Sequence, residues 1–199
     1  MSTFPVSGLP SAPCSPPSEA VVGIACGLFD RLTPLHALSE DDRGLLERAC
    51  RVRLVVTDPH SLAGDGVDVT EPLGELGCRE VAIVEAVNHY ASDLLPRVGH
   101  GIWRRLDAAE QHRVAWLVAI VRMAEGLEVE FAGSADGIYA TWTDSLLHIE
   151  VDGGHVFGQQ LTAARRKAAA LESVSGRRLL LTSSYRRLGM LYPDRQIAN

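Results

Sequence analysis

Closely spaced cysteines, long apolar runs and an excess of basic residues are all missing from this chain of 199 residues. Its four cysteines, Cys14, Cys26, Cys50 and Cys78, form no CxxC pair, which argues against a zinc knuckle and favours free thiols in a reducing cytosol. No apolar run approaches the ~20 residues that cross a bilayer, and the N-terminus has no basic residue of a secretory signal. We therefore expect a cytoplasmic protein with no membrane partner.

The charge balance and the missing motifs narrow the classes of function. Lys and Arg number 19 against 25 Asp and Glu, a net charge of −6, which argues against a nucleic-acid partner. The sequence contains no G-x-S-x-G serine motif, no P-loop and no dinucleotide fingerprint. Serine-nucleophile chemistry therefore has no support in the sequence. The hydrophobic content of 46% is that of an ordinary globular protein.

Apolar residues at helical spacing predict two helices in the first quarter of the chain. The first begins at Ser18, and Pro34 is expected to end it. The second begins at Ser39, which forms a variant capping box with Asp42. Its buried stripe consists of Leu45, Leu46, Ala49 and Val52.

Two further helices follow an irregular segment. The third covers residues 77–91, and the fourth begins at Asp107 with Glu110 as its capping partner and extends to Leu127. Because the fourth helix has the longest apolar pattern, we expect it to form the spine of the domain.

The pattern changes from helical to alternating after Gly133. Residues 138–142 and 147–151 predict a hairpin, residues 161–174 a helix closed by Gly176, and residues 178–182 a third strand. The predicted fold is therefore mostly α with a small α+β unit of order strand, strand, helix, strand. The domain boundaries follow: a disordered lead-in at 1–17, a helical domain at 18–130, the small subdomain at 131–185 and a tail at 186–199.

The irregular segment at residues 57–76 carries the densest polar group of the sequence, Asp58, His60, Asp65 and Asp68. This spacing matches neither an EF-hand nor a zincin motif. Turn chemistry explains such a composition without any ligand, because Asp and Gly favour turns. A metal or phosphate-ester site is the functional alternative.

Four strings, in this order, resemble the C-terminal half of the exopolyphosphatase and guanosine pentaphosphate phosphohydrolase family. They are LFDRLTPLHALSEDDRGLLERAC (28–50), VNHY (87–90), RMAEGLE (122–128) and LTAARRKAAALESVSGRRLLL (161–181). The resemblance implies a helical domain related to the HD phosphohydrolases, followed by a small α/β unit, and it also implies dimerisation. The family's two actin-like catalytic domains have no counterpart in these 199 residues.

The same resemblance places the metal-binding His-Asp or His-Glu pair of such domains on Arg53 and Leu54. Arginine stays protonated and has no lone pair to give a metal, and leucine has no ligand atom. The sequence therefore predicts a degenerate HD-like domain. A rebuilt divalent-metal site is the alternative, and its candidate ligands are Asp58, His60, His89 and Glu125. Without that alternative we expect no cofactor.

Three functions follow from these patterns. The leading hypothesis is a non-catalytic binding or regulatory module that acts on a protein partner or on a second copy of itself. The first alternative is a metal-dependent phosphohydrolase for phosphoanhydride substrates with its site near His60. The second is a sensor of polyphosphate or a guanosine polyphosphate, bound by a basic cluster of five residues. These residues are Arg165, Arg166, Lys167, Arg177 and Arg178, and a solvated helix face is the simpler interpretation of them.

Overall fold

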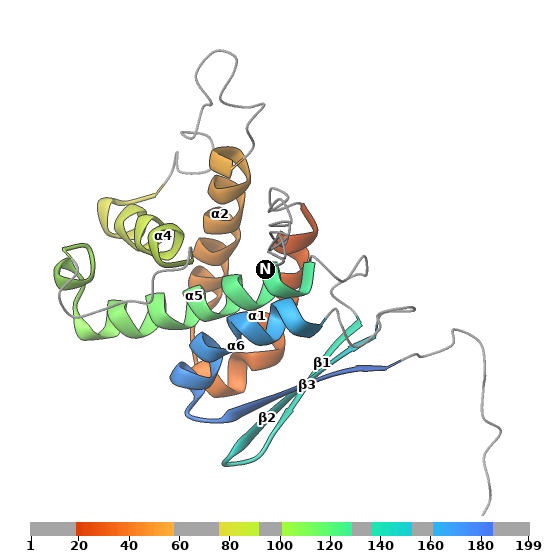
Figure 1. The fold of residues 1–199 in the computed structure, drawn as a ribbon. Helices are drawn as coiled ribbons and strands as arrows, with labels where there is room; N and C mark the ends of the chain where they lie inside the picture. The colour runs from red at the N-terminus through yellow and green to blue at the C-terminus, as the bar shows by residue number, and fades with distance from the viewer. Residues whose placement is uncertain (1–18, 58–75, 92–100, 129–136, 153–160, 185–199) are drawn as a thin grey trace, which may run out of the picture.

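The computed structural model describes residues 19–57, 76–91, 101–128, 137–152 and 161–184. In these ranges the chain is mostly helical with one small three-stranded sheet, which confirms the predicted combination of helices and a small α+β unit (Figure 1). The elements are α1 (Glu19–His36), α2 (Glu40–Thr57), α4 (Cys78–Ala91), the 3-10 helix η2 (Trp103–Arg105), α5 (Ala108–Glu128), β1 (Ile138–Trp142), β2 (Leu146–Asp152), α6 (Leu161–Ser175) and β3 (Arg178–Ser184). The predicted lead-in, the tail and most of the irregular segment at residues 57–76 lie outside the described residues.

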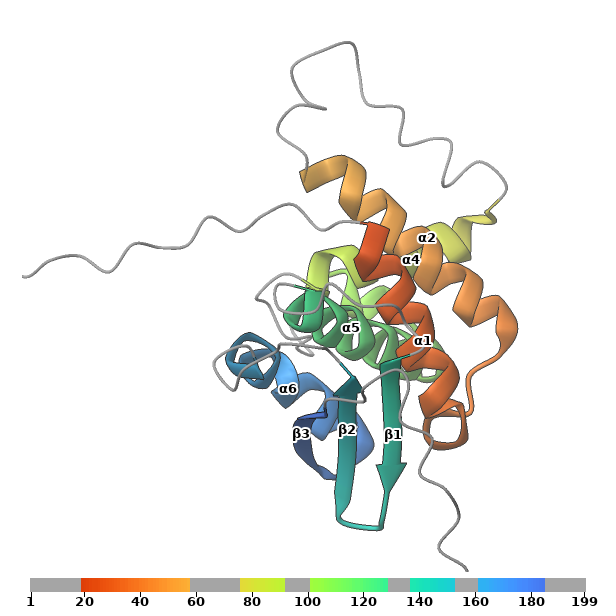
Figure 2. The same ribbon diagram turned by 90° about the vertical axis from the view of Figure 1, so that its right-hand side faces the viewer.

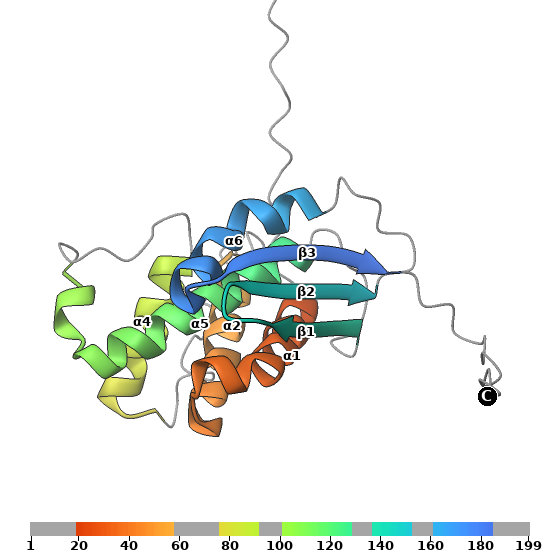
Figure 3. The same cartoon turned by 90° about the horizontal axis from the view of Figure 1, so that it is seen from below.

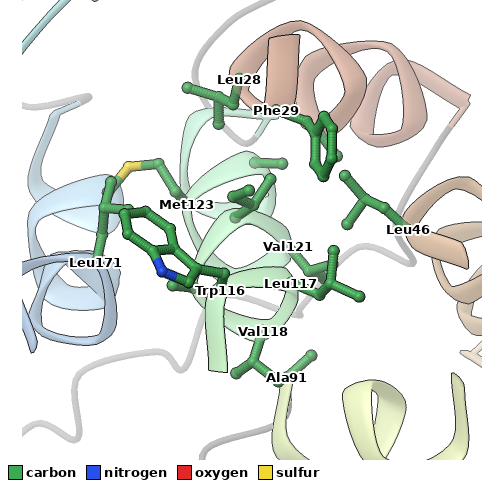
Figure 4. Close-up of a cluster of buried hydrophobic side chains, with 14 of the residues drawn as sticks. Leu28, Phe29, Leu46, Ala91, Trp116, Leu117, Val118, Val121, Met123 and Leu171 are labelled. Atoms are coloured by element: carbon green, nitrogen blue, oxygen red, sulfur yellow. The ribbon is translucent and has the colours of Figure 1, made fainter. Parts of the chain in front are cut away.

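Helix α5 occupies the centre of the molecule, as the sequence predicts for its longest apolar pattern. It contacts α1, α2, α4 and α6, and its buried residues lie on every side of the helix. A helix that is apolar all round must be surrounded by other elements. Figure 4 shows Leu117 near Leu46 of α2, Val118 near Ala91 of α4, and Trp116 facing α6.

The two predicted capping boxes are confirmed. The Ser39 N–H donates to Asp42 Oδ2 at 3.0 Å, and the Asp42 N–H donates to Ser39 Oγ at 3.3 Å. The Asp107 N–H donates to Glu110 Oε2, and the Glu110 N–H donates to Asp107 Oδ1, both at 2.9 Å. Each box satisfies backbone donors that the first turn of a helix leaves without partners.

The predicted end of the first helix at Pro34 is wrong, because α1 continues through Pro34 to His36. A proline in the last turn forfeits one backbone hydrogen bond but leaves its own carbonyl in place. The helix ends at His36, and the next residue, Ala37, has a φ of 52°. The Leu38 N–H then donates to Nδ1 of His36 at 2.9 Å, so the histidine side chain takes part in closing the helix.

The small sheet has the strand order β1-β2-β3, with β1 antiparallel and β3 parallel to β2. Figures 2 and 3 show it beside the helices, with β1 near α1 and β3 near α6. Ile149 and Leu181 are paired across β2 and β3, and both are buried against the helices. Trp142, the last residue of β1, is 37% exposed.

Helices α5 and α6 join the helical part to the small unit through a close backbone approach. A Cβ built at Gly126 would lie 2.7 Å from the Cα of Ala164. The small side chains of Ala164 and Ala168 face the same junction and are buried. One continuous hydrophobic core therefore contains residues from both sides of the predicted boundary at 130/131.

Candidate functional site

Arg53, which the resemblance aligns with the metal-binding pair, lies in the last turns of α2 and points into the helical bundle. Its Nε donates to Oε1 of Glu125 on α5. Its Nη1 donates to the backbone carbonyl of Asn88 on α4 at 3.4 Å. One guanidinium therefore connects three helices, α2, α4 and α5.

Lys167 of α6 binds the second oxygen of the same carboxylate. Its Nζ lies 2.6 Å from Glu125 Oε2. The side chain of Glu125 is only 9% exposed, whereas those of Arg53 and Lys167 are 16% and 32% exposed. Losing either cation would leave this poorly solvated carboxylate with one positive partner instead of two. We call Arg53, Glu125 and Lys167 the ionic triad.

The ionic triad limits what Glu125 can do as a metal ligand. Each of its two carboxylate oxygens already accepts a hydrogen bond from a cation. A metal ion at this carboxylate would have to displace an ammonium or a guanidinium group and would meet the repulsion of the other. In the part of the chain that the structure describes, no group of three or more His, Cys, Asp or Glu side chains is arranged to hold a metal ion.

Of the other candidate metal ligands, only His89 lies among the described residues. His89 lies in the last turn of α4, exposed, and its ring packs edge-on against Tyr90 with 4.8 Å between the ring centroids. A histidine at this end of a helix is favoured by the helix dipole. Asp58 and His60, with Asp65 and Asp68, lie outside the described residues. The rebuilt metal site near His60 therefore stays a prediction.

The predicted basic cluster divides into residues with different surroundings. Arg165 and Arg166 are exposed on α6, while Lys167 belongs to the ionic triad. Arg177 donates to the carbonyls of Thr143 at 2.7 Å and Ser175 at 2.8 Å. Arg178 is exposed at the start of β3.

The residues of the basic cluster are also far apart along α6. Arg165 lies in the second turn of α6 and Arg177 lies beyond the end of that helix, about 15 Å or more further along. The five residues therefore do not converge as one compact ligand site.

Asn88 and Arg122 belong to two of the strings that carry the resemblance, but the sequence predicted no role for either residue. Nε and Nη1 of Arg122 on α5, and both side-chain polar atoms of Asn88, are buried without a hydrogen-bond partner among the described residues. Leaving a buried donor unsatisfied costs about 1–3 kcal/mol. One feature of the sequence could have indicated Arg122, because this charged residue stands between two apolar residues of a predicted helix. Both neighbours, Val121 and Met123, are fully buried.

Burial shifts the pKa values of two thiols, Cys26 and Cys50, and of the His36 imidazole toward their neutral forms. Burial raises the pKa of Cys50 to about 12, so this thiol stays protonated. Burial also raises the pKa of Cys26. His36 lies between the rings of Phe29 and Trp116, and burial lowers its pKa.

Two other ion pairs are built on the helix caps. Asp42 accepts from Arg113, and Glu110 accepts from Arg79, while each acid also closes its own capping box. These contacts fix the beginnings of α2 and α5 and leave neither acid available as a general base. Their role is structural.

Comparison with known proteins assigns neither a family nor a function to this chain. No protein-family model matches the chain, and no curated protein matches it. Among the described helices, none is both long enough and apolar enough to cross a membrane.

Proposed function

We propose that this chain is a non-catalytic binding or regulatory module, cytoplasmic, with a degenerate HD-like helical domain. The observation that carries the proposal is the contact of Arg53 with Glu125. The residue that the resemblance aligns with the metal-binding pair is a cation, and it binds the buried carboxylate of Glu125. An HD-type reaction needs several metal ligands converging at this place, and the described contacts provide an ion pair instead.

A combined metal and activity measurement tests this proposal. Protein purified without chelators is analysed for Mn, Fe and Mg, and is then incubated with nucleotide and polyphosphate substrates in the presence of each ion. We expect less than stoichiometric divalent metal and no release of phosphate. Stoichiometric metal together with hydrolysis that disappears in His60→Ala would replace the proposal with the phosphohydrolase hypothesis.

The partner that we propose is a second copy of the chain. The observation that favours it is the position of the large apolar side chains that are exposed in the described structure. Leu146 and Leu180 lie on the outer face of the small sheet, whereas Trp142, at the end of β1, pairs with Leu147 of the inner face. Exposed apolar groups that gather on one element are typical of protein contact surfaces.

A polyanion sensor is a second candidate, favoured by the exposure of Arg165 and Arg166 on α6. Polyphosphate or a guanosine polyphosphate bound only to the folded state would raise the melting temperature. Because such contacts are screened by salt, the stabilisation should weaken as salt is added. The double variant Arg165→Gln/Arg166→Gln should lose it, and equal stabilisation of this variant would remove the candidate.

A further inference from the structure

Arg122 is the least well satisfied charge that the described structure contains. It lies in the C-terminal half of α5, yet Nε and Nη1 of its guanidinium are buried with no hydrogen-bond partner among the described residues. Guanidinium has five N–H donors, accepts nothing and does not lose its proton. Unlike a buried lysine, Arg122 cannot become neutral, so the cost of its burial must be offset by acceptors from outside these contacts.

The carboxylate of Glu125 does not supply those acceptors in the described contacts. Glu125 lies one turn further along α5, on the same face as Arg122. Arg53 occupies its Oε1 and Lys167 its Oε2. Arg122 therefore stands beside a carboxylate that two other cations already share.

Asn88 brings a second unsatisfied group to the same junction. The guanidinium of Arg53 that binds Glu125 also reaches the backbone carbonyl of Asn88. The amide nitrogen and oxygen of the Asn88 side chain are both buried and without a hydrogen-bond partner in the described ranges. The ends of α2, α4 and α5 thus gather cations and an unsatisfied amide, and the junction reaches the surface because Arg53, Asn88 and Arg122 are each partly exposed.

The chemistry of these groups selects a class of ligand. A planar guanidinium fits two oxygens of a phosphate group and supplies charge as well as hydrogen bonds. The Asn88 amide can donate to a further oxygen and accept from a hydroxyl group. A water molecule would satisfy some of the donors but would leave the positive charge of the junction unbalanced.

We propose that Arg122, with Asn88 and Arg53, forms a binding site for a small phosphate-bearing anion at the junction of α2, α4 and α5. The proposal rests on the proposed function because it assigns binding without hydrolysis to the site. The site is separate from the exposed basic residues of α6. Its ligand is either inorganic phosphate or a phosphate monoester that carries a hydroxyl group.

The test compares the full-length chain with Arg122→Gln and with a matched control, Arg104→Gln. Both substitutions remove one positive charge, but Arg104 is exposed in η2 and belongs to no candidate binding site. Melting temperatures are measured with increasing inorganic phosphate or glycerol 3-phosphate, at constant ionic strength set by chloride. We expect saturable stabilisation of the wild type and of Arg104→Gln, and an affinity lower by roughly tenfold or more in Arg122→Gln.

The stability without ligand gives a second readout. Because Arg122 is unsatisfied without a ligand, Arg122→Gln should fold at least as stably as the wild type in chloride alone. Loss of stability in chloride together with an unchanged response to phosphate would show that Arg122 serves the fold and would overturn the site. Equal responses of the two variants, or no saturable response of the wild type to either probe, would also overturn it.

The two probes also separate this proposal from the proposed function. Stabilisation by glycerol 3-phosphate but not by inorganic phosphate would identify the ligand as an ester. Release of phosphate from the ester would contradict the non-catalytic function while leaving the site in place. A wild type that neither binds nor hydrolyses either probe would contradict the site alone.

Discussion

His36 shows how a single side chain can close a helix and fill a core. Its Nδ1 accepts the Leu38 N–H, so the proton is on Nε2, which donates to the Phe29 carbonyl at 3.0 Å. The ring is buried between Phe29 and Trp116. Burial lowers its pKa, although the bond to the Phe29 carbonyl and the charge of Asp42 oppose that change.

This histidine should make the stability of the protein depend on pH. The unfolded chain takes up a proton near pH 6.5, whereas the folded imidazole does so only at lower pH. The unfolded state therefore binds more protons on acidification, and the free energy of unfolding falls as the pH decreases below about 6.5. Urea unfolding at about pH 7.5 and about pH 5 should show a smaller loss in His36→Gln than in the wild type.

The control for this prediction is His112→Gln, which removes an exposed imidazole. It should keep most of the loss of stability at acid pH. An identical pH dependence in the wild type and in His36→Gln would show that this histidine is not the titrating group.

At the scale of the elements, the contact between α5 and α6 depends on the absence of a side chain at Gly126. A Cβ at this position would lie 2.7 Å from the Cα and 3.1 Å from the backbone nitrogen of Ala164. Backbone atoms cannot move aside as the end of a flexible side chain can. Gly126→Ala should therefore push the two helices apart and lower the free energy of unfolding by about 1–3 kcal/mol.

Two other helical glycines provide matched controls for Gly126→Ala. A Cβ at Gly23 or Gly44 would meet no atom within 4 Å. Alanine at either position should stabilise the protein by up to about 1 kcal/mol, because glycine loses more backbone freedom on folding. Denaturant unfolding of the three variants measures the contrast, and a Gly126→Ala variant as stable as the controls would contradict the close approach.

At the scale of the whole molecule, the exposed apolar side chains of the sheet suggest where two copies meet. Leu180 is 43% exposed, and Leu146 and Trp142 are each 37% exposed. In the described sheet β3 pairs only with β2, so its other edge has no strand beside it. Such an edge favours pairing with a second chain unless it is short or charged.

We expect a dimer that forms through this sheet. Light scattering after size-exclusion chromatography should give twice the chain mass of 21.5 kDa. The double variant Leu146→Lys/Leu180→Lys should give the monomer mass, because burying two ammonium groups at the contact is costly. The exposed variant Arg166→Gln should remain dimeric, and a monomeric wild type at high concentration would contradict the prediction.

Sequence patterns predicted the elements better than they predicted the site. The capping boxes at Ser39 and Asp107 and the positive φ of Gly176 are local features, so a few neighbouring residues determine them. The predicted end at Pro34 is wrong because a proline in the last turn of a helix costs little enough for packing to override it. The partners of Glu125 could not be predicted, since Arg53 and Lys167 lie 72 and 42 residues away from it in the sequence.

The sequence by itself determined the helices, the hairpin and the central position of α5, because periodicity and capping act over a few residues. It also identified Arg53 as a cation that cannot bind a metal. Only the tertiary structure decided what that arginine does, because its contacts with Glu125 and Asn88 arise from the packing of α2, α4 and α5. The same packing buries part of Arg122 without an acceptor, and no local pattern determines whether a charged side chain finds its partner.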